Sequence, residues 1–317
     1  MSNAYILSLP SAMLMAMEID QVETFVAIVR RGGFTRAASS LHLSQPAVSR
    51  RLDLLERELG RPLFDRTRSG ARLTEAGQAF LPHAEALLAS MRDGVEAVHG
   101  LDRTDRGVVT VALVGTLAST ELTARLKRFR RAYPDVKLAV RTALSREVSA
   151  LVRRGDAALG LRYFADPDPD LVSVPLYGEG LVTVCAPTHR LARARKVTAK
   201  MLAGEAWVAF PVRQGSSGES YAEMLVERLA ALGLSSAEIV TIDSLTAQKR
   251  LVEAGFGLGL LPSSGVEEEL RVGTLRALPV AAMRLVVPVV LVHRRRGHLS
   301  GAARALMALL AERQKAG

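Results

Sequence analysis

The chain has 317 residues, of which 49% are hydrophobic and 23% are charged, so it is long enough for about two domains and too apolar for wholesale disorder. The formal net charge is +10 at pH 7, but residues 1–106 hold 13 arginines and 13 acidic residues, so the whole excess lies in residues 107–317. Net charge therefore does not identify a nucleic-acid-binding protein by itself, and DNA binding has to be argued from the local placement of residues.

Cysteine content and hydropathy exclude several classes of protein. Cys185 is the one cysteine, so neither an intramolecular disulfide nor a cysteine-based zinc site can form. No apolar run approaches the roughly 20 residues of a membrane span. Residues 1–16 lack the basic start of a secretory signal and precede the first periodic pattern, so we expect a disordered extension there. These features favour a cytoplasmic protein without a membrane partner.

The pattern after residue 17 is typical of three short helices. Apolar residues at helical spacing predict the first helix over residues 19–30, ended by Gly32 and Gly33. Thr35 stands where the N-cap of a second helix belongs, and Ser44 where the N-cap of a third belongs. The third helix is predicted to end at Gly60.

The third predicted helix has an apolar face and a polar face. Its apolar face is formed by Val48, Leu52, Leu55 and Leu59. A separate arc of the helix carries Gln45, Pro46, Ser49, Arg50 and Asp53. A recognition helix needs this arrangement, because the polar residues of its first turns enter the major groove of DNA. Glutamine can pair with adenine and arginine with guanine, while serines and a helix N-terminus suit phosphate contacts.

Two short strands around a turn follow, over residues 61–74, and predict a wing. Arg66, Arg68 and Arg72 are candidates for phosphate or minor-groove contacts. A helix-rich protein-interaction module is the alternative; it would explain the apolar face of the third helix but not the basic wing.

The residues from position 34 to position 77 resemble the signature of the LysR-type family of bacterial transcription regulators. The resemblance rests on Phe34 to Ala38, Leu41, Ser44 to Ser49, Leu55-Glu56, Leu59-Gly60, Leu63 to Arg66 and Leu73 to Gly77. It implies a winged helix-turn-helix DNA-binding domain over residues 17–74. The candidate DNA-binding residues are Thr35, Arg36, Ser44, Gln45, Pro46, Ser49, Arg50, Arg66 and Arg68.

A long helix is predicted to follow, with Thr74 as its N-cap. Its apolar stripe is typical of a coiled-coil interface but could also pack within the chain; it consists of Phe80, Ala84, Leu87, Met91, Val95, Val98 and Leu101. We take residues 75–106 as a linker helix and hinge. The family resemblance implies that this helix forms a homodimer, and that dimers assemble into a homotetramer.

From Gly107 onward, strands alternate with helices, which predicts an α/β fold with largely parallel strand pairing. Buried-strand patterns cover residues 108–114, 136–140 and 157–161, with helices at about 120–131 and 147–153. A second α/β unit contains Trp207, and a late strand at 285–292 precedes a closing helix at 300–312. The glycines at 255–259 are not interpreted as a nucleotide loop, because no helix follows them in the required order.

This half of the chain resembles the effector-binding domain of LysR-type regulators, which implies the two-lobed fold of periplasmic binding proteins over residues 107–317. Lobe I is expected over about 107–184 and 263–317, and lobe II over about 185–262. The whole chain is thus classed as α/β with an all-α and winged N-terminal module. The candidate effector-binding residues, in the cleft between the lobes, are Thr116, Leu117, Ser145, Gly215, Ser216 and Ser217. Ser145 is also the expected N-cap of a helix, and hydroxyls at helix starts suit a carboxylate or other anion.

An enzyme is disfavoured, since no nucleophile elbow, phosphate loop or metal-ligand spacing occurs; we assign no catalytic residue, no metal and no cofactor. The resemblance implies a sequence-specific transcriptional regulator whose partners are double-stranded DNA, at an inverted repeat in a promoter, and a small-molecule effector. The alternative is an effector-independent DNA-binding protein. It would bind with little sequence preference and with steep salt dependence.

Overall fold

A computed structural model describes residues 17–67, 70–99, 107–212 and 221–312. The expected N-terminal extension lies outside these residues. The chain divides into two compact units, Met1–Val98 and His99–Gly317, and each is described by itself. Within the described residues, no helix is both long enough and apolar enough to cross a membrane.

The first unit consists of three short helices, a two-stranded hairpin and a long helix. In chain order these are α1 (Ile19–Arg31), α2 (Phe34–Leu41), α3 (Gln45–Leu59), β1 (Phe64–Thr67), β2 (Gly70–Leu73) and α4 (Glu75–His99). Gly32 and Gly60 end α1 and α3 in the left-handed conformation, as expected from sequence. The N-cap of α2 is Gly33 rather than Thr35, because the helix begins at Phe34, two residues earlier than predicted. The predicted wing is confirmed, with β1 and β2 antiparallel.

Four phenylalanines hold the first unit together. The ring of Phe25 in α1 lies 5.5 Å from that of Phe64 in the wing and 5.3 Å from that of Phe80 in α4. Phe34 of α2 approaches Phe64 at 5.9 Å, edge to face. Because these rings come from four different elements, they fix the wing and the start of α4 against the helix-turn-helix.

The apolar stripe of α4 divides into two parts. Its first part packs within the unit, where Ala84 is buried and Phe80 contacts the core. Its second part is exposed: Leu87, Met91, Val95 and Val98 have exposed fractions from 41% to 64%. Leu101 lies outside the described residues. The stripe thus combines intramolecular packing with an apolar surface that a partner helix could cover.

The second unit is an α/β domain built on one mixed sheet. Its strands are β3 (Gly107–Val114), β4 (Val136–Ala143), β5 (Leu159–Tyr163), β6 (Leu171–Cys185), β7 (Trp207–Ala209), β8 (Ile239–Thr241), β9 (Leu258–Pro262), β10 (Arg276–Leu278) and β11 (Leu285–Arg294). Its α-helices are α5 (Thr120–Ala132), α6 (Ser145–Arg153), α7 (Ala199–Leu202), α8 (Tyr221–Ala231), α9 (Leu245–Glu253), α10 (Glu267–Val272) and α11 (Gly301–Ala311). Three short 3₁₀ helices are η1 (Gly115–Leu117), η2 (Ser263–Gly265) and η3 (Ala281–Met283).

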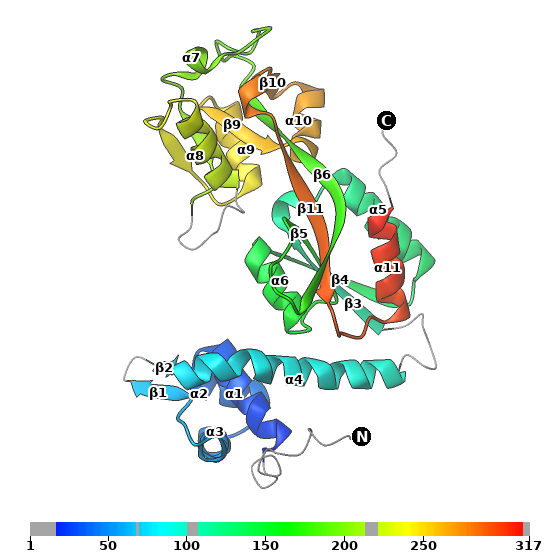
Figure 1. Cartoon of the computed structure of the whole chain (residues 1–317). Helices are drawn as coiled ribbons and strands as arrows, with labels where there is room; N and C mark the ends of the chain where they lie inside the picture. Colours follow the sequence, from blue (N-terminus) through cyan, green and yellow to red (C-terminus); the bar gives the residue numbers. More distant parts are fainter. Residues whose placement is uncertain (1–16, 68–69, 100–106, 213–220, 313–317) are drawn as a thin grey trace, which may run out of the picture. The chain divides into compact units, whose positions relative to one another are not determined.

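The strand order of the sheet is β4-β3-β5-β11-β6-β9-β7-β8, with β10 also paired to β6. Pairing is parallel within each lobe, between β3 and its neighbours and between β7 and its neighbours. The two long strands β6 and β11 are antiparallel to each other and connect the lobes, as Figure 1 shows. The expectation of largely parallel pairing is therefore wrong for the centre of the sheet.

Helices cover both faces of the sheet in each lobe. In lobe I, α5 and α11 pack on one face through Phe129 and Leu306, while α6 packs on the other through Val148 and Val152. In lobe II, α8 covers one face and α9 the other. The sequence analysis expected lobe I to resume at residue 263. Val266 and Leu275 instead pack in the same cluster as Val208 of lobe II, so the chain returns to lobe I only through β11.

Candidate DNA interface and effector cleft

The start of α3 presents polar side chains to solvent. Gln45, Pro46 and Arg50 are exposed, and Ser49 is partly buried. The opposite face of α3 is fully buried through Val48, Leu52 and Leu55. Burial of this face fixes the orientation of the helix about its axis, so the polar arc of its first turns stays available to a groove of DNA.

Local hydrogen bonds order the residues around the start of α3. Ser44 accepts a hydrogen bond from the amide of Ala47 at 3.3 Å, which confirms the predicted N-cap. Thr35 of α2 is exposed, and its hydroxyl donates to Oε1 of Gln45 at 3.4 Å. Arg36 is exposed and donates to the carbonyl of Gly32 at 2.7 Å. The structure therefore gathers Thr35, Ser44 and Gln45 at one corner of the helix-turn-helix.

Glu56 attaches the wing to α3. Its Oε1 accepts hydrogen bonds from the backbone amides of Leu63, at 2.6 Å, and of Phe64, at 3.3 Å. Sequence analysis used Glu56 as part of a signature but assigned it no role. Arg72 on β2 is exposed. Arg68 and the side chain of Arg66 lie outside the described part of the structure.

A cleft of about 1070 Å³ lies between the two lobes of the second unit. Lobe I contributes the end of β3, the start of α5 and the loop that leads into α6. The other wall consists of the start of α9, the short helix η2 and the helix α10. This volume is slightly above the roughly 300–1,000 Å³ of typical small-molecule pockets, so the cleft has room for a small organic ligand.

The predicted effector residues have different positions relative to this cleft. Thr116 lines it, but is 8% exposed and its hydroxyl is 2.8 Å from the hydroxyl of Tyr163. Leu117 is buried and faces a different, smaller pocket. Ser145 is the first residue of α6 rather than its N-cap, which is Leu144. Gly215, Ser216 and Ser217 lie outside the described residues.

Leu144 takes the cap position because Glu147 satisfies its amide. Oε2 of Glu147 accepts a hydrogen bond from the amide of Leu144 at 3.1 Å, the glutamate half of a capping box. A serine one residue further on is then part of the first helical turn. Leu144 and Glu147 both line the cleft, whereas Ser145 is not among its lining residues.

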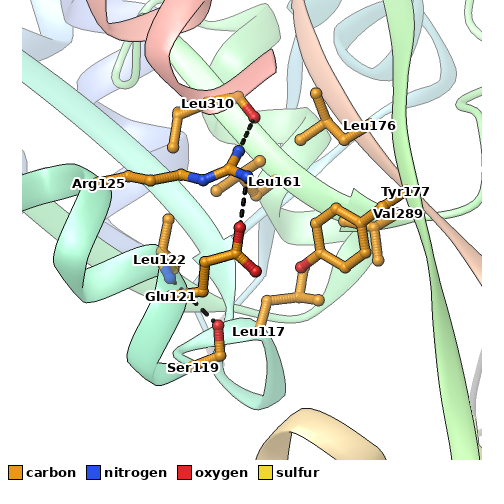
Figure 2. Close-up of a pocket in the computed structure, with 10 residues that line it drawn as sticks. All are labelled: Leu117, Ser119, Glu121, Leu122, Arg125, Leu161, Leu176, Tyr177, Val289 and Leu310. Carbon is orange, nitrogen blue, oxygen red and sulfur yellow. Dashed lines mark hydrogen bonds and ion pairs between the residues drawn. The ribbon is translucent and has the colours of Figure 1, made fainter. Parts of the chain in front are cut away.

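The smaller pocket lies inside lobe I, between α5, α11 and the sheet (Figure 2). Arg125 donates to the carbonyl of Leu310 at 2.5 Å and contacts Glu121 at 2.5 Å, so its guanidinium joins α5 to α11. Burial, together with the charges of Glu179 and Glu121, raises the pKa of Tyr177 to about 12. The cavity measures about 20 Å³, room for about one water molecule and not for an organic effector.

The described lining of the cleft carries a net negative charge, which the sequence analysis did not predict. This lining contains five carboxylates and two cations: Glu147, Asp243, Glu267, Glu268, Glu269, Lys249 and Arg271. These residues come from three separate parts of the chain. The run of three glutamates after β9 was the one local signal, and a charge run by itself usually indicates a solvated helix face.

Glu179 on β6 is a buried carboxylate near the junction of the lobes. It is 4% exposed and accepts three hydrogen bonds from η2. Its Oε1 receives them from the hydroxyl of Ser263 and the amide of Ser264, both at 3.1 Å, and its Oε2 from the hydroxyl of Ser264 at 2.8 Å. Since η2 lines the cleft and β6 connects the lobes, Glu179 links the cleft wall to the connecting strand.

The described residues contain no group of three or more histidine, cysteine, aspartate or glutamate side chains arranged to hold a metal ion. Cys185 is fully buried in β6. Burial and, to a lesser extent, the charge of Glu205 raise its pKa to about 11, which disfavours the reactive thiolate.

Comparison with protein-family models finds matches to both units. Residues 19–78 match the model described as bacterial regulatory helix-turn-helix protein, lysR family, and residues 102–315 match the LysR substrate binding domain. Among curated proteins, the chain is 31% identical to the HTH-type transcriptional regulator CfxR of Cupriavidus necator, over 86% of this chain and 84% of the relative. It is also 31% identical to the uncharacterized HTH-type transcriptional regulator YeiE of Escherichia coli, over 92% and 96% of the two chains.

Solved structures with the same fold include a full-length OxyR variant of Pseudomonas aeruginosa, with a TM-score of 0.69 and 19% identity over 93% of both chains. Full-length CbnR in complex with its target DNA has a TM-score of 0.62 and 23% identity, over 93% of this chain and 99% of that one. ArgP of Mycobacterium tuberculosis has a TM-score of 0.68 and 21% identity, over 92% and 97%.

Proposed function

The chain belongs to the LysR family of bacterial transcription regulators, with a helix-turn-helix DNA-binding domain and an effector-binding domain, and from that premise we propose how it works. It binds an inverted repeat in a promoter, and a small molecule bound between the two lobes changes that interaction. The observation that carries the proposal is the interlobe cleft of about 1070 Å³ in a chain whose α3 presents an exposed polar start.

DNA recognition is assigned to the exposed corner formed by α2 and α3. Gln45 and Arg50 are proposed to contact base edges, while the remaining residues hold the phosphate backbone. These remaining residues are Thr35, Arg36, Ser44, Pro46, Ser49, Arg66 and Arg68. Their support is the exposure of the described members, which is partial for Ser49, and the fixed orientation of α3. Arg72 of the wing is exposed and is added as a further backbone contact.

The domain boundaries are proposed at residues 17–74 for DNA binding, 75–106 for the linker and 107–317 for effector binding. The exposed second half of the α4 stripe supports a homodimer formed through that helix. We further propose that two dimers assemble into a tetramer in the bacterial cytoplasm, associated with DNA and without catalytic activity.

Within the cleft, Thr116 is the predicted effector residue that the lining supports. Because its hydroxyl also contacts Tyr163, an effector that reaches Thr116 would compete for or extend this hydrogen bond. We keep Ser145, Gly215, Ser216 and Ser217 as candidates from the family resemblance, and assign Leu117 a packing role.

A competition gel shift tests the proposal against effector-independent, non-specific binding. Purified protein is mixed with labelled DNA from upstream of its own gene, at a stated salt concentration, and challenged with excess random DNA. A complex that survives the competitor supports a specific regulator. The non-specific alternative is favoured if unlabelled random DNA displaces the complex as effectively as unlabelled upstream DNA does. In that case binding to both DNAs should also depend steeply on salt concentration.

A further inference from the structure

The described lining of the interlobe cleft is acidic, although the chain as a whole carries a formal charge of +10. Both of its cations are already paired: Lys249 with Glu269 at 2.6 Å, and Arg271 with Glu268 at 2.7 Å. Within the described part of the chain, the other three carboxylates, Glu147, Asp243 and Glu267, form no ion pair. The described part of the cleft wall therefore has an excess of negative charge.

The helix starts that reach the cleft are already supplied with acceptors from the chain itself. Ser119 accepts from the amide of Leu122 at the start of α5, and Ser244 from the amide of Ala247 at the start of α9. At the start of α6, Glu147 does the same for Leu144. Each of these hydrogen bonds leaves one amide fewer for an incoming anion, which would also meet the Glu147 carboxylate at the start of α6.

Helix stabilisation by itself explains why some of these acids are where they are. Glu147 and the three glutamates at 267–269 lie in first helical turns, where the helix dipole favours negative charge. This preference does not account for the burial of the Glu269 carboxylate. Oε1 of Glu269 pairs with Lys249, but its Oε2 is buried in the cleft wall without a hydrogen-bond partner. A buried carboxylate oxygen without a donor is costly. Because this oxygen has no accessible surface, a ligand in the cleft does not contact it, and Glu269 contributes to the wall through its negative charge.

The cleft is not arranged for a metal ion, since no metal-binding cluster occurs among the described residues. Its carboxylates are spread over α6, the segment before α9, and α10, around a volume of about 1070 Å³. Dispersed carboxylates in a large cleft match an extended molecule with separated positive groups better than they match a single ion.

We propose that the effector is an organic cation, an amine or guanidinium compound with more positive than negative groups, which Asp243 and Glu267 recognise. This inference rests on the proposed function and replaces the anionic effector expected from sequence. The ammonium or guanidinium groups would donate hydrogen bonds to the exposed carboxylates of Asp243 and Glu267.

Isothermal titration calorimetry on the full-length protein tests the proposal, with spermidine and agmatine as cationic probes and citrate and benzoate as anionic probes. We expect a cationic probe to bind with one site per chain, and Asp243→Asn and Glu267→Gln each to weaken it roughly tenfold, the loss expected for a hydrogen bond to a charged group. Glu227→Gln, an exposed carboxylate on α8 that does not line the cleft, is the matched control and should leave the affinity unchanged.

Three results would overturn the proposal. The first is saturable binding of citrate or benzoate that strengthens when the cleft carboxylates are neutralised. The second is cation binding that Glu227→Gln weakens as much as Asp243→Asn and Glu267→Gln do. The third is the absence of binding by both cationic probes at millimolar concentration. A gel shift on the same variants separates this inference from the proposed function. If specific DNA binding persists while the cation titrations fail, only the proposed class of effector is wrong. If the unmodified protein shows no specific DNA binding, the proposed function is wrong.

Discussion

Replacing Gly77 with alanine should destabilise the DNA-binding unit, although alanine is the better helix former. A Cβ atom at Gly77 would lie 2.2 Å from the carbonyl oxygen of Leu63 and 2.8 Å from Cδ2 of Leu73. The Leu63 carbonyl cannot turn away freely, because it accepts a hydrogen bond from the amide of Thr74 at 3.0 Å. The gain in helix propensity is about 1 kcal/mol, whereas overpacking against backbone costs up to about 3 kcal/mol, so we expect a net loss of up to about 2 kcal/mol.

Native-state hydrogen exchange of the α3 amides is the suitable assay, because a two-unit chain has no single free energy of unfolding. Gly77→Ala should speed the exchange of α3. The control is the reciprocal change Ala79→Gly, at an exposed position of the same helix, which measures the propensity difference alone. If Gly77→Ala slowed exchange by as much as Ala79→Gly accelerated it, the close approach of α4 to the wing would be wrong.

Three further predictions concern single side chains. Gln45→Ala should relax base discrimination at a cost of roughly 1–3 kcal/mol, measured by gel shift, and equal losses on specific and random DNA would contradict base contact. Cys185, whose raised pKa of about 11 leaves about one thiolate in 10⁴ at pH 7, should resist iodoacetamide in the folded protein, and rapid labelling would contradict its burial. Burial raises the pKa of Asp166, but hydrogen bonds and the charge of Arg162 outweigh burial and lower it overall. Its stabilising contribution is therefore full above the unfolded-state pKa of about 3.9 and is lost as pH falls through the lower folded-state pKa. Asp166→Asn should weaken the acid dependence of thermal stability followed by circular dichroism, and an unchanged acid profile would exclude this contribution.

Local signals were sufficient to predict the first unit. Ser44 caps the start of α3 with its side chain, and Gly60 ends the helix in the left-handed backbone conformation. Both features depend on neighbours within a few residues. The wing was also predicted, although Glu56, which attaches it to α3, was not. The prediction of Thr35 as N-cap was wrong because α2 starts two residues earlier, with Gly33 as its N-cap.

The second unit could be predicted less completely, because its decisive contacts are distant in sequence. Strand β11 pairs with β6 across more than a hundred residues, and no local pattern indicates that this pairing is antiparallel. The same limit applies to the cleft. Glu147 and Asp243 are far apart in the sequence, so their common wall and its charge emerge only when the lobes are assembled.

Glu179 illustrates a residue whose importance was invisible in the sequence. It stands between Gly178 and Gly180 on β6, where the side chains of Val286 and Ser263 lie close to the positions that Cβ atoms would occupy. The glycines allow β11 and η2 to approach β6 closely, and the carboxylate then fixes η2 through three hydrogen bonds. Because η2 lines the cleft, this arrangement is a physical route by which a ligand could bias the angle between the lobes.

A nuclease footprint of the purified full-length protein on the DNA upstream of its own gene tests the central claim most directly. A protected inverted repeat that survives competitor DNA, and whose boundaries change when a cleft ligand is added, is the predicted result. Protection that disappears with competitor, or that stays the same when a ligand shown by calorimetry to occupy the cleft is present, would contradict an effector-controlled, sequence-specific regulator.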